Sequence, residues 1–134
     1  MYAPLACALT SCAPHATGVA CNAACADEES ARAAFTRLDA GEGVLAEAFV
    51  PFERELAVMV ARTPSGGRAA YPVVETVQRN HVCHEVVAPA PIPADARGRA
   101  REVALAATEA AEGLGVTGVE MFQVAGGAVL VNEL

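Results

Sequence analysis

The chain has 134 residues, of which 54% are hydrophobic, and it carries a formal net charge of -7 at neutral pH. This length is typical of one domain that buries roughly two-thirds of its unfolded surface. The acidic balance argues against a nucleic-acid partner, because affinity for phosphates comes mainly from clustered cations, and the lack of an apolar run of about 18 residues argues against a membrane span.

The first 25 residues are rich in Ala and Cys and differ in composition from the rest of the chain. They lack the basic start of a secretory signal. The chain has 5 cysteines, an odd number crowded toward the beginning, which does not suggest a disulfide framework. We therefore expect a reduced, cytoplasmic setting. We also expect two parts, a leader over 1–25 that is disordered or foreign to the fold, and a folded region over 26–134.

An acidic cluster at 27–29 predicts the start of a helix, because the positive end of a helix favours acidic side chains. Apolar residues then recur at helical spacing up to Leu38, and Gly41 and Gly43 mark the exit. Beyond them the alternation has period two. It predicts an antiparallel meander of three strands, over 44–50, 55–62 and 68–75.

A proline-rich segment, 88–93, cannot donate hydrogen bonds at three positions and is expected to be an extended connector. Small apolar residues at helical spacing predict a long helix from Asp95 to about Gly113. The last part of the chain has two alternating runs, 119–125 and 128–134, on either side of a Gly-Gly pair. This arrangement predicts a hairpin with a two-residue turn.

With such a turn, Glu120 lies directly across from Glu133, with Cα atoms about 4.5 to 5.5 Å apart. The same face is expected to carry Phe122, Val124, Val129 and Val131. Two carboxylates on an apolar face repel each other, and a magnesium ion that also holds nucleotide phosphates would relieve the repulsion. The alternatives are a hairpin edge with both side chains in water, or a bulge that shifts the register by one.

From Asp27 to Leu134 the chain resembles the ATP-grasp domain of the 5-(carboxyamino)imidazole ribonucleotide synthase family. The resemblance rests on five pieces in order, namely EAFVPFEREL at 47–56, YPVVE at 71–75, APAP at 88–91, EMF at 120–122 and NEL at 132–134. It implies an α+β fold corresponding to the C-terminal lobe of an ATP-grasp domain, with a mostly antiparallel sheet and two helices packed on one face.

The resemblance implies an ATP-dependent carbon–nitrogen ligase of de novo purine biosynthesis, with ATP and Mg2+ as cofactors. In that family ATP phosphorylates bicarbonate, and the resulting carboxyphosphate carboxylates the amino group of 5-aminoimidazole ribonucleotide. Full-length relatives are expected to be homodimers that bind these small molecules and have no nucleic-acid or membrane partner.

The resemblance also assigns nucleotide-binding residues. The adenine would be lined, largely through backbone groups, by the strand of Glu47, Ala48, Phe49 and Val50. Glu55 would bind the ribose hydroxyls, since an ionised carboxylate accepts two hydrogen bonds. For Glu47 and Glu55 the alternative is an ordinary polar residue on the solvent face of a sheet.

Four further positions match family residues at the phosphates and base. Gln78 falls where the family has a nucleotide-contacting residue, often histidine, although it could also be an ordinary turn residue. Glu120 and Glu133 match the magnesium ligands, with Asn132 beside them among the ATP-binding residues. The resemblance assigns no catalytic residue.

Three features depart from the family pattern. The chain has no lysine and no glycine-rich loop over 1–25, where the family closes over the phosphates. It stops at Leu134, before a family segment that carries phosphate and substrate ligands, and its approach to Glu120 is shorter. We therefore expect weak ATP binding, and no catalysis by this chain alone.

Three rival interpretations stay open. The first is another ATP-grasp ligase, similar to biotin carboxylase or glycinamide ribonucleotide synthetase. The second is a non-catalytic structural fragment that packs against a partner chain through exposed strand edges. The third is a zinc-binding module in the leader. Its candidate ligands are Cys7, Cys12, His15, Cys21 and Cys25.

Overall fold

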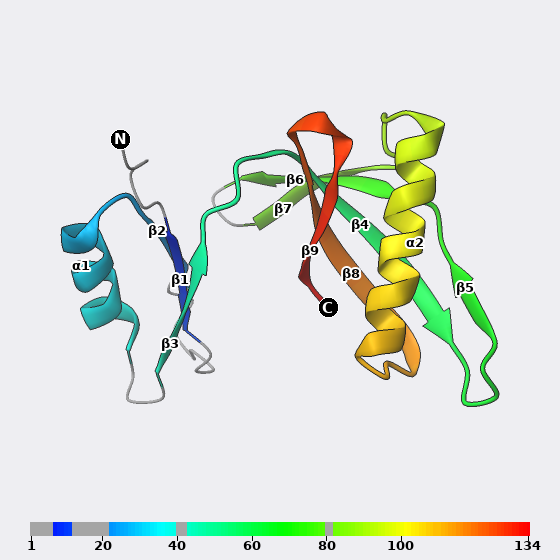
Figure 1. Cartoon of the computed structure of the whole chain (residues 1–134), viewed down its shortest axis with the longest axis horizontal. Helices are drawn as coiled ribbons and strands as arrows, with labels where there is room; N and C mark the ends of the chain where they lie inside the picture. Colours follow the sequence, from blue (N-terminus) through cyan, green and yellow to red (C-terminus); the bar gives the residue numbers. More distant parts are fainter. Residues whose placement is uncertain (1–6, 12–21, 40–42, 80–81) are drawn as a thin grey trace. The chain divides into compact units, whose positions relative to one another are not determined.

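The computed structural model describes residues 7–11, 22–39, 43–79 and 82–134. The chain divides into two compact units, one ending at Val50 and the other beginning at Pro51. Each unit has its own sheet and its own helix (Figure 1). Each also has its own cluster of buried residues. The sequence placed the boundary after residue 25 instead. No helix in the described ranges is long and apolar enough to cross a membrane.

The first unit is a three-stranded antiparallel sheet with one helix. It contains β1 (Cys7–Ser11), β2 (Asn22–Cys25), α1 (Glu28–Leu38) and β3 (Val44–Ala48), with strand order β2-β1-β3. Two pieces of the leader are therefore strands of this sheet, whereas the sequence predicted a segment that is disordered or foreign to the fold. Strand β1 pairs on both sides, with β2 and with β3, so its backbone groups have ladder partners. Alanine is depleted in strands generally, so the local composition gave little signal for them.

Helix α1 lies where the sequence predicted it and begins with a capping box. The Asp27 carboxylate accepts a hydrogen bond from the Ser30 backbone N–H at 2.8 Å, and the Ser30 hydroxyl accepts one from the Asp27 N–H at 3.1 Å. The pKa of Asp27 is lowered, mainly by the hydrogen bond from the Ser30 side chain. Ala34 and Leu38 pack with Cys25, whereas Phe35 remains exposed.

The second unit is a six-stranded antiparallel sheet with one helix. Its elements are β4 (Phe52–Arg62), β5 (Arg68–Ala70), β6 (Val74–Arg79), β7 (Val82–Val87), α2 (Ala94–Ala110), β8 (Gly115–Val124), the 3-10 turn η1 (Ala125–Gly127) and β9 (Val129–Glu133). The strand order is β7-β6-β4-β8-β9, and β5 also pairs with β4. Helix α2 lies against β4, β8 and β9 on one face of this sheet (Figure 1).

The predicted meander over 44–50, 55–62 and 68–75 is wrong in its pairing. Strand β3 pairs with β1 and not with β4. The third predicted strand is divided into β5 and β6 around Pro72, which has no N–H to donate to a ladder. Strand β7 was not predicted. The α+β class, the antiparallel pairing and the two helices are confirmed, but each helix covers its own sheet.

The core of the second unit lies between α2 and the sheet. Leu56, Val58 and Val60 of β4 and Val119 and Met121 of β8 are buried there. They face the alanines of α2, chiefly Ala96, Ala100 and Ala104. Small side chains let a helix approach a sheet closely, and this stripe agrees with the helical spacing seen in the sequence. Leu114 lies beyond the end of the helix at Ala110 and is exposed.

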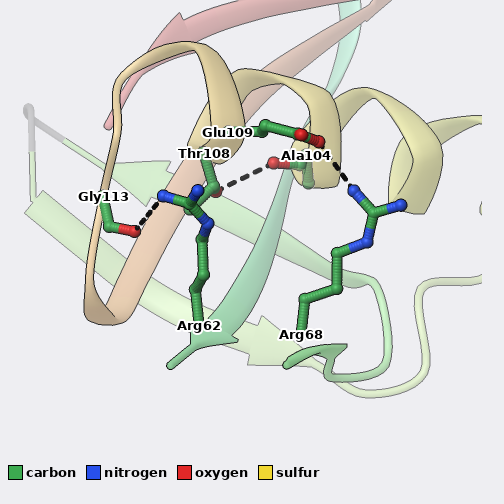
Figure 2. A network of polar contacts seen from close by, with 6 residues as sticks. All are labelled: Arg62, Arg68, Ala104, Thr108, Glu109 and Gly113. Atoms are coloured by element: carbon green, nitrogen blue, oxygen red, sulfur yellow. Dashed lines mark hydrogen bonds and ion pairs between the residues drawn. The ribbon is translucent and has the colours of Figure 1, made fainter. Parts of the chain in front are cut away.

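Polar contacts hold the β4–β5 hairpin to the last turns of α2 and to the loop that follows it (Figure 2). Arg68 forms an ion pair with Glu109 at 2.6 Å, and Arg62 donates to the Gly113 carbonyl at 3.2 Å. Within the helix the buried Thr108 hydroxyl donates to the Ala104 carbonyl at 2.9 Å. Helix α2 covers one face of the sheet, and the residues considered next lie on the opposite face.

Candidate functional site

The C-terminal hairpin places Glu120 directly opposite Glu133, as predicted. The turn, however, differs from the prediction. It is the three-residue turn η1, with Gly126 and Gly127 at φ of 82° and 79° and with the Val124 N–H bonded to the Ala128 carbonyl at 3.0 Å. A turn of this length shifts the ladder by one residue relative to a two-residue turn.

A β-bulge then corrects that shift. Met121 pairs with Val131, whereas Glu120 pairs with Glu133, so Asn132 is an extra residue in β9. Without the bulge Asn132 would oppose Glu120, and Glu133 would point to the other face. The bulge that the sequence offered as an alternative therefore exists, and it brings the carboxylates together.

The apolar neighbours of the pair differ from those expected. Leu130, and neither of the two valines, opposes Phe122. Val131 opposes Met121, and Val129 packs against the core beneath α2. The correction has a simple cause, because side chains alternate along a strand and a one-residue offset moves each of them to the other face.

Strand β4 adds a third carboxylate to this face. Ala57 opposes Glu120, and Glu55 lies two residues before Ala57. Opposed residues share a face, and so do residues two apart in a strand. Glu55, Glu120 and Glu133 therefore lie on one face of the sheet, and α2 covers the other.

Gln78 of β6 joins the three carboxylates. Thr76 opposes Glu55, and Gln78 follows it by two residues on the same face. The Gln78 side chain hydrogen-bonds to the Glu55 carboxylate. We call the set of Glu55, Gln78, Glu120 and Glu133 the acidic face. All four residues were candidates from the sequence, and the structure brings them together.

The electrostatics of the acidic face are unfavourable without a cation. Burial raises the pKa of Glu120, and the neighbouring Glu133 carboxylate raises it further. Burial also raises the pKa of Glu55, the Glu120 charge adds to this effect, and the hydrogen bond with Gln78 opposes it. Both groups thus hold their protons more tightly than exposed glutamates, and the positive charge of a bound cation would offset this effect.

Glu55 also has an unsatisfied oxygen. Its Oε2 atom is buried and has no hydrogen-bond partner among the described atoms. A buried acceptor without a donor is destabilising by about 1 to 3 kcal/mol. The site therefore fits a ligand that brings a hydroxyl or N–H to this position.

A pair of stacked rings lies beside Glu55 on the same face. The Phe52 and Phe122 ring centroids are 4.5 Å apart and the planes differ by 7°. Phe52 is 40% exposed, so part of the pair is open to a ligand. Sequence reasoning did not single out this stack, because a bulge between Phe52 and Arg54 decides whether Phe52 lies beside Phe122.

The other predicted residues lie elsewhere or at the margin. Glu47 and Ala48 belong to β3 of the first unit, and Phe49 and Val50 follow that strand. Asn132 is exposed at the bulge, next to Glu133. Of the zinc alternative, Cys12, His15 and Cys21 fall outside the described residues. Within the described residues, His, Cys, Asp and Glu side chains do not gather in threes that could hold a metal ion.

Known proteins resemble this chain in sequence and in fold. The model of the ATP-grasp domain family matches residues 17–134. The chain belongs to the ATP-grasp family. This ATP-grasp chain is 48% identical over 91 residues to an N5-carboxyaminoimidazole ribonucleotide synthase from Synechococcus elongatus, a match that covers 68% of this chain and 23% of the relative.

Solved structures that resemble this chain carry the same enzyme name as its sequence relatives. The ATP-grasp chain matches the ADP complex of purK, an N5-carboxyaminoimidazole ribonucleotide synthetase, with a TM-score of 0.86 and 28% identity over 98% of this chain and 34% of that one. It matches an Aspergillus clavatus synthase, in complex with ADP and 5-aminoimidazole ribonucleotide, with a TM-score of 0.82 and 31% identity over 95% of this chain and 32% of that one. The chain thus spans about a third or less of these relatives.

Proposed function

We propose that this ATP-grasp chain supplies part of the nucleotide and magnesium site of a ligase that uses ATP and bicarbonate to carboxylate 5-aminoimidazole ribonucleotide in purine biosynthesis. The names of its relatives support the reaction, and they do not favour a biotin carboxylase or a glycinamide ribonucleotide synthetase. A cytoplasmic setting and a homodimeric full-length protein belong to the same proposal.

The observation that carries the proposal is the pair of carboxylates from the half-buried Glu120 and the exposed Glu133, opposed across β8 and β9. We assign these two residues as magnesium ligands. Magnesium is typically held by one or two carboxylates together with substrate phosphates and water, so a group of three protein ligands is not required. When bound, the ion supplies positive charge that neutralises the phosphate oxygens during phosphoryl transfer.

Glu55 and its neighbours are assigned to the nucleoside. The unpartnered Oε2 of Glu55 is suited to accept a hydrogen bond from a ribose hydroxyl. Gln78 holds the same carboxylate by a hydrogen bond, which leaves that oxygen for the ligand. The adenine is assigned to the segment of Glu47, Ala48, Phe49 and Val50, and Asn132 to the phosphate end beside Glu133.

The metal assignment is tested by calorimetric titration of ATP with magnesium into the folded protein. We expect saturable binding that weakens about tenfold or more in Glu120→Gln and in Glu133→Gln, because each substitution removes a charged metal ligand. The matched control is Glu102→Gln, an exposed residue of α2 with the same change in charge. Equal binding by all three variants would contradict the assignment.

The ribose assignment is tested by comparing ATP with 2′-deoxy-ATP and 3′-deoxy-ATP. The wild type should prefer ATP over at least one of them by about tenfold or more, because a hydrogen bond to a charged group is worth about 1.5 to 3 kcal/mol. Glu55→Gln should lose most of this preference while it keeps its dependence on magnesium. A preference that survives in Glu55→Gln would remove Glu55 from the ribose site.

A further inference from the structure

A hollow of about 380 Å³ lies beside the N-terminal half of α2, and no acidic-face residue lines it. One wall is apolar and includes Pro72, Val73 and Pro89. The other wall belongs to α2 and presents Arg97, Gly98 and Arg101. None of its lining residues carries a carboxylate. We call this hollow the arginine pocket.

The two arginines lie one helical turn apart, so both guanidinium groups reach the same hollow. Arg97 Nη1 donates to the carbonyls of Ala90 and Ile92, and Arg101 Nη2 donates to the Ala70 carbonyl at 3.4 Å. Neither forms an ion pair with any described residue. Because each guanidinium has five N–H donors, most of them stay available to a ligand.

The acidic side chains near the pocket do not neutralise these two charges. Asp95 pairs with Arg99 at 2.8 Å, and Glu109 pairs with Arg68. Glu102 follows Arg101 in α2 and is exposed. In a protein with a net charge of -7, the hollow therefore presents two positive charges that no ion pair among the described residues neutralises.

Gly98 gives an independent indication that the arginine pocket is open to a ligand. It lies inside α2, where glycine is less favourable than alanine. A Cβ at this position would meet no atom within 4 Å, so packing within the described chain does not require a glycine. Glycine is expected where a ligand approaches the backbone closely, and Gly98 lies between the two arginines.

The opposite wall is held firmly. The Ala90 N–H donates to the Val73 carbonyl and the Ile92 N–H to the Ala90 carbonyl, both at 2.8 Å. Val73, Ala90 and Ile92 are buried in the core of the second unit. Because the Arg97 guanidinium is bonded to this segment, its position is set before any ligand arrives, which favours binding.

We propose that the arginine pocket binds a small organic anion, whose oxyanion group pairs with Arg97 and Arg101 and whose body packs on Pro72, Val73 and Pro89 beside Gly98. Guanidinium groups bind phosphate and carboxylate oxygens through paired hydrogen bonds. The volume is near the lower end of small-ligand pockets, about 300 to 1,000 Å³. The site is separate from the acidic face, so its test does not depend on nucleotide binding.

Inorganic phosphate and acetate are titrated separately into the whole protein with EDTA present, and amide shifts are followed by NMR. We expect saturable shifts at Gly98 and Arg101, and the anion with the lower Kd indicates whether a phosphate or a carboxylate group is preferred. Arg101→Gln should raise that Kd about tenfold. The matched control Arg99→Gln makes the same change in charge outside the pocket and should raise it less than about twofold by Coulomb screening alone.

Gly98→Leu provides a test in which stability and binding move in opposite directions. Leucine is a better helix former than glycine, so the melting temperature should rise or stay equal while the side chain occupies the hollow and anion binding is lost. The proposal is overturned if neither anion saturates the folded protein, if Arg99→Gln and Arg101→Gln weaken binding equally, or if Gly98→Leu binds like the wild type.

Discussion

Glu55 and Glu120 each have a raised pKa in the folded chain, and this gives stability a definite dependence on pH. A carboxyl whose pKa is higher in the folded state than in the unfolded state binds its proton more tightly when folded. Stability therefore falls as pH rises from the ordinary value through the raised value. The pKa values of Asp27 and Asp95 are lowered, so these two groups make stability rise with pH, but only at pH values below their ordinary pKa. The two effects therefore fall in different pH ranges.

We accordingly expect the urea midpoint, measured without magnesium, to increase as pH is lowered from about 7 to about 5. Glu120→Gln should flatten this dependence and raise stability at pH 7 by about 0.5 kcal/mol, because it removes a like charge directly opposite Glu133. Glu102→Gln, exposed on α2, should leave the pH profile unchanged. A midpoint that stays level or drops between pH 7 and pH 5 would contradict the proposed electrostatics.

The opposed pair is thus a feature that weakens the free protein while it suits a cation. Residues that lower the stability of the folded protein are typical of functional sites. Glu55, Gln78, Glu120 and Glu133 could be chosen from the sequence because motif order and strand alternation mark them. The Phe52–Phe122 stack could not be predicted, because it depends on a bulge in β4 and the sequence around Phe52 does not indicate a bulge.

Among the elements, those with local signals were predicted and those that depend on distant partners were not. The acidic start of α1 and the apolar spacing of α2 can both be recognised from residues that are close together in the sequence. The partner of β3 is β1, which lies more than thirty residues earlier in a segment of alanine and cysteine, and nothing within β3 identifies it. The Glu120–Glu133 pair was predicted correctly although its turn was not, because the longer turn and the bulge cancel.

The conformation of the turn η1 can be tested by substituting Gly126. Gly126 has a φ of 82°, a region that is unfavourable for residues with a Cβ. Gly126→Ala is expected to lower the free energy of unfolding by about 1 kcal/mol. Gly98→Ala, in a helix with open space around the new Cβ, should raise it by up to about 1 kcal/mol. Urea titrations that give both substitutions the same sign would show that η1 is assigned wrongly.

At the scale of the whole molecule, the two units have cores of unequal size. The core of the second unit contains buried residues from β4, β8 and α2, whereas that of the first contains Cys25, Ala34 and Leu38. A chain of residues 51–134 should therefore fold alone and unfold cooperatively in urea. Leu56→Ala within it should lower stability by about 3 kcal/mol, because it leaves a cavity in the core. A non-cooperative transition in the 51–134 chain would mean that this core needs the first unit.

The sharing of a divalent ion by Glu120 and Glu133 can be measured by adding traces of Mn2+ with ATP to the isotopically labelled protein. Manganese can replace magnesium because both prefer oxygen ligands, and it broadens the NMR signals of residues near it. We expect the amides around Glu120 in β8 and Glu133 in β9 to broaden first, and Glu120→Gln to abolish the effect. Broadening that begins elsewhere in the chain, or that is unchanged in Glu120→Gln, would contradict a metal site on the acidic face.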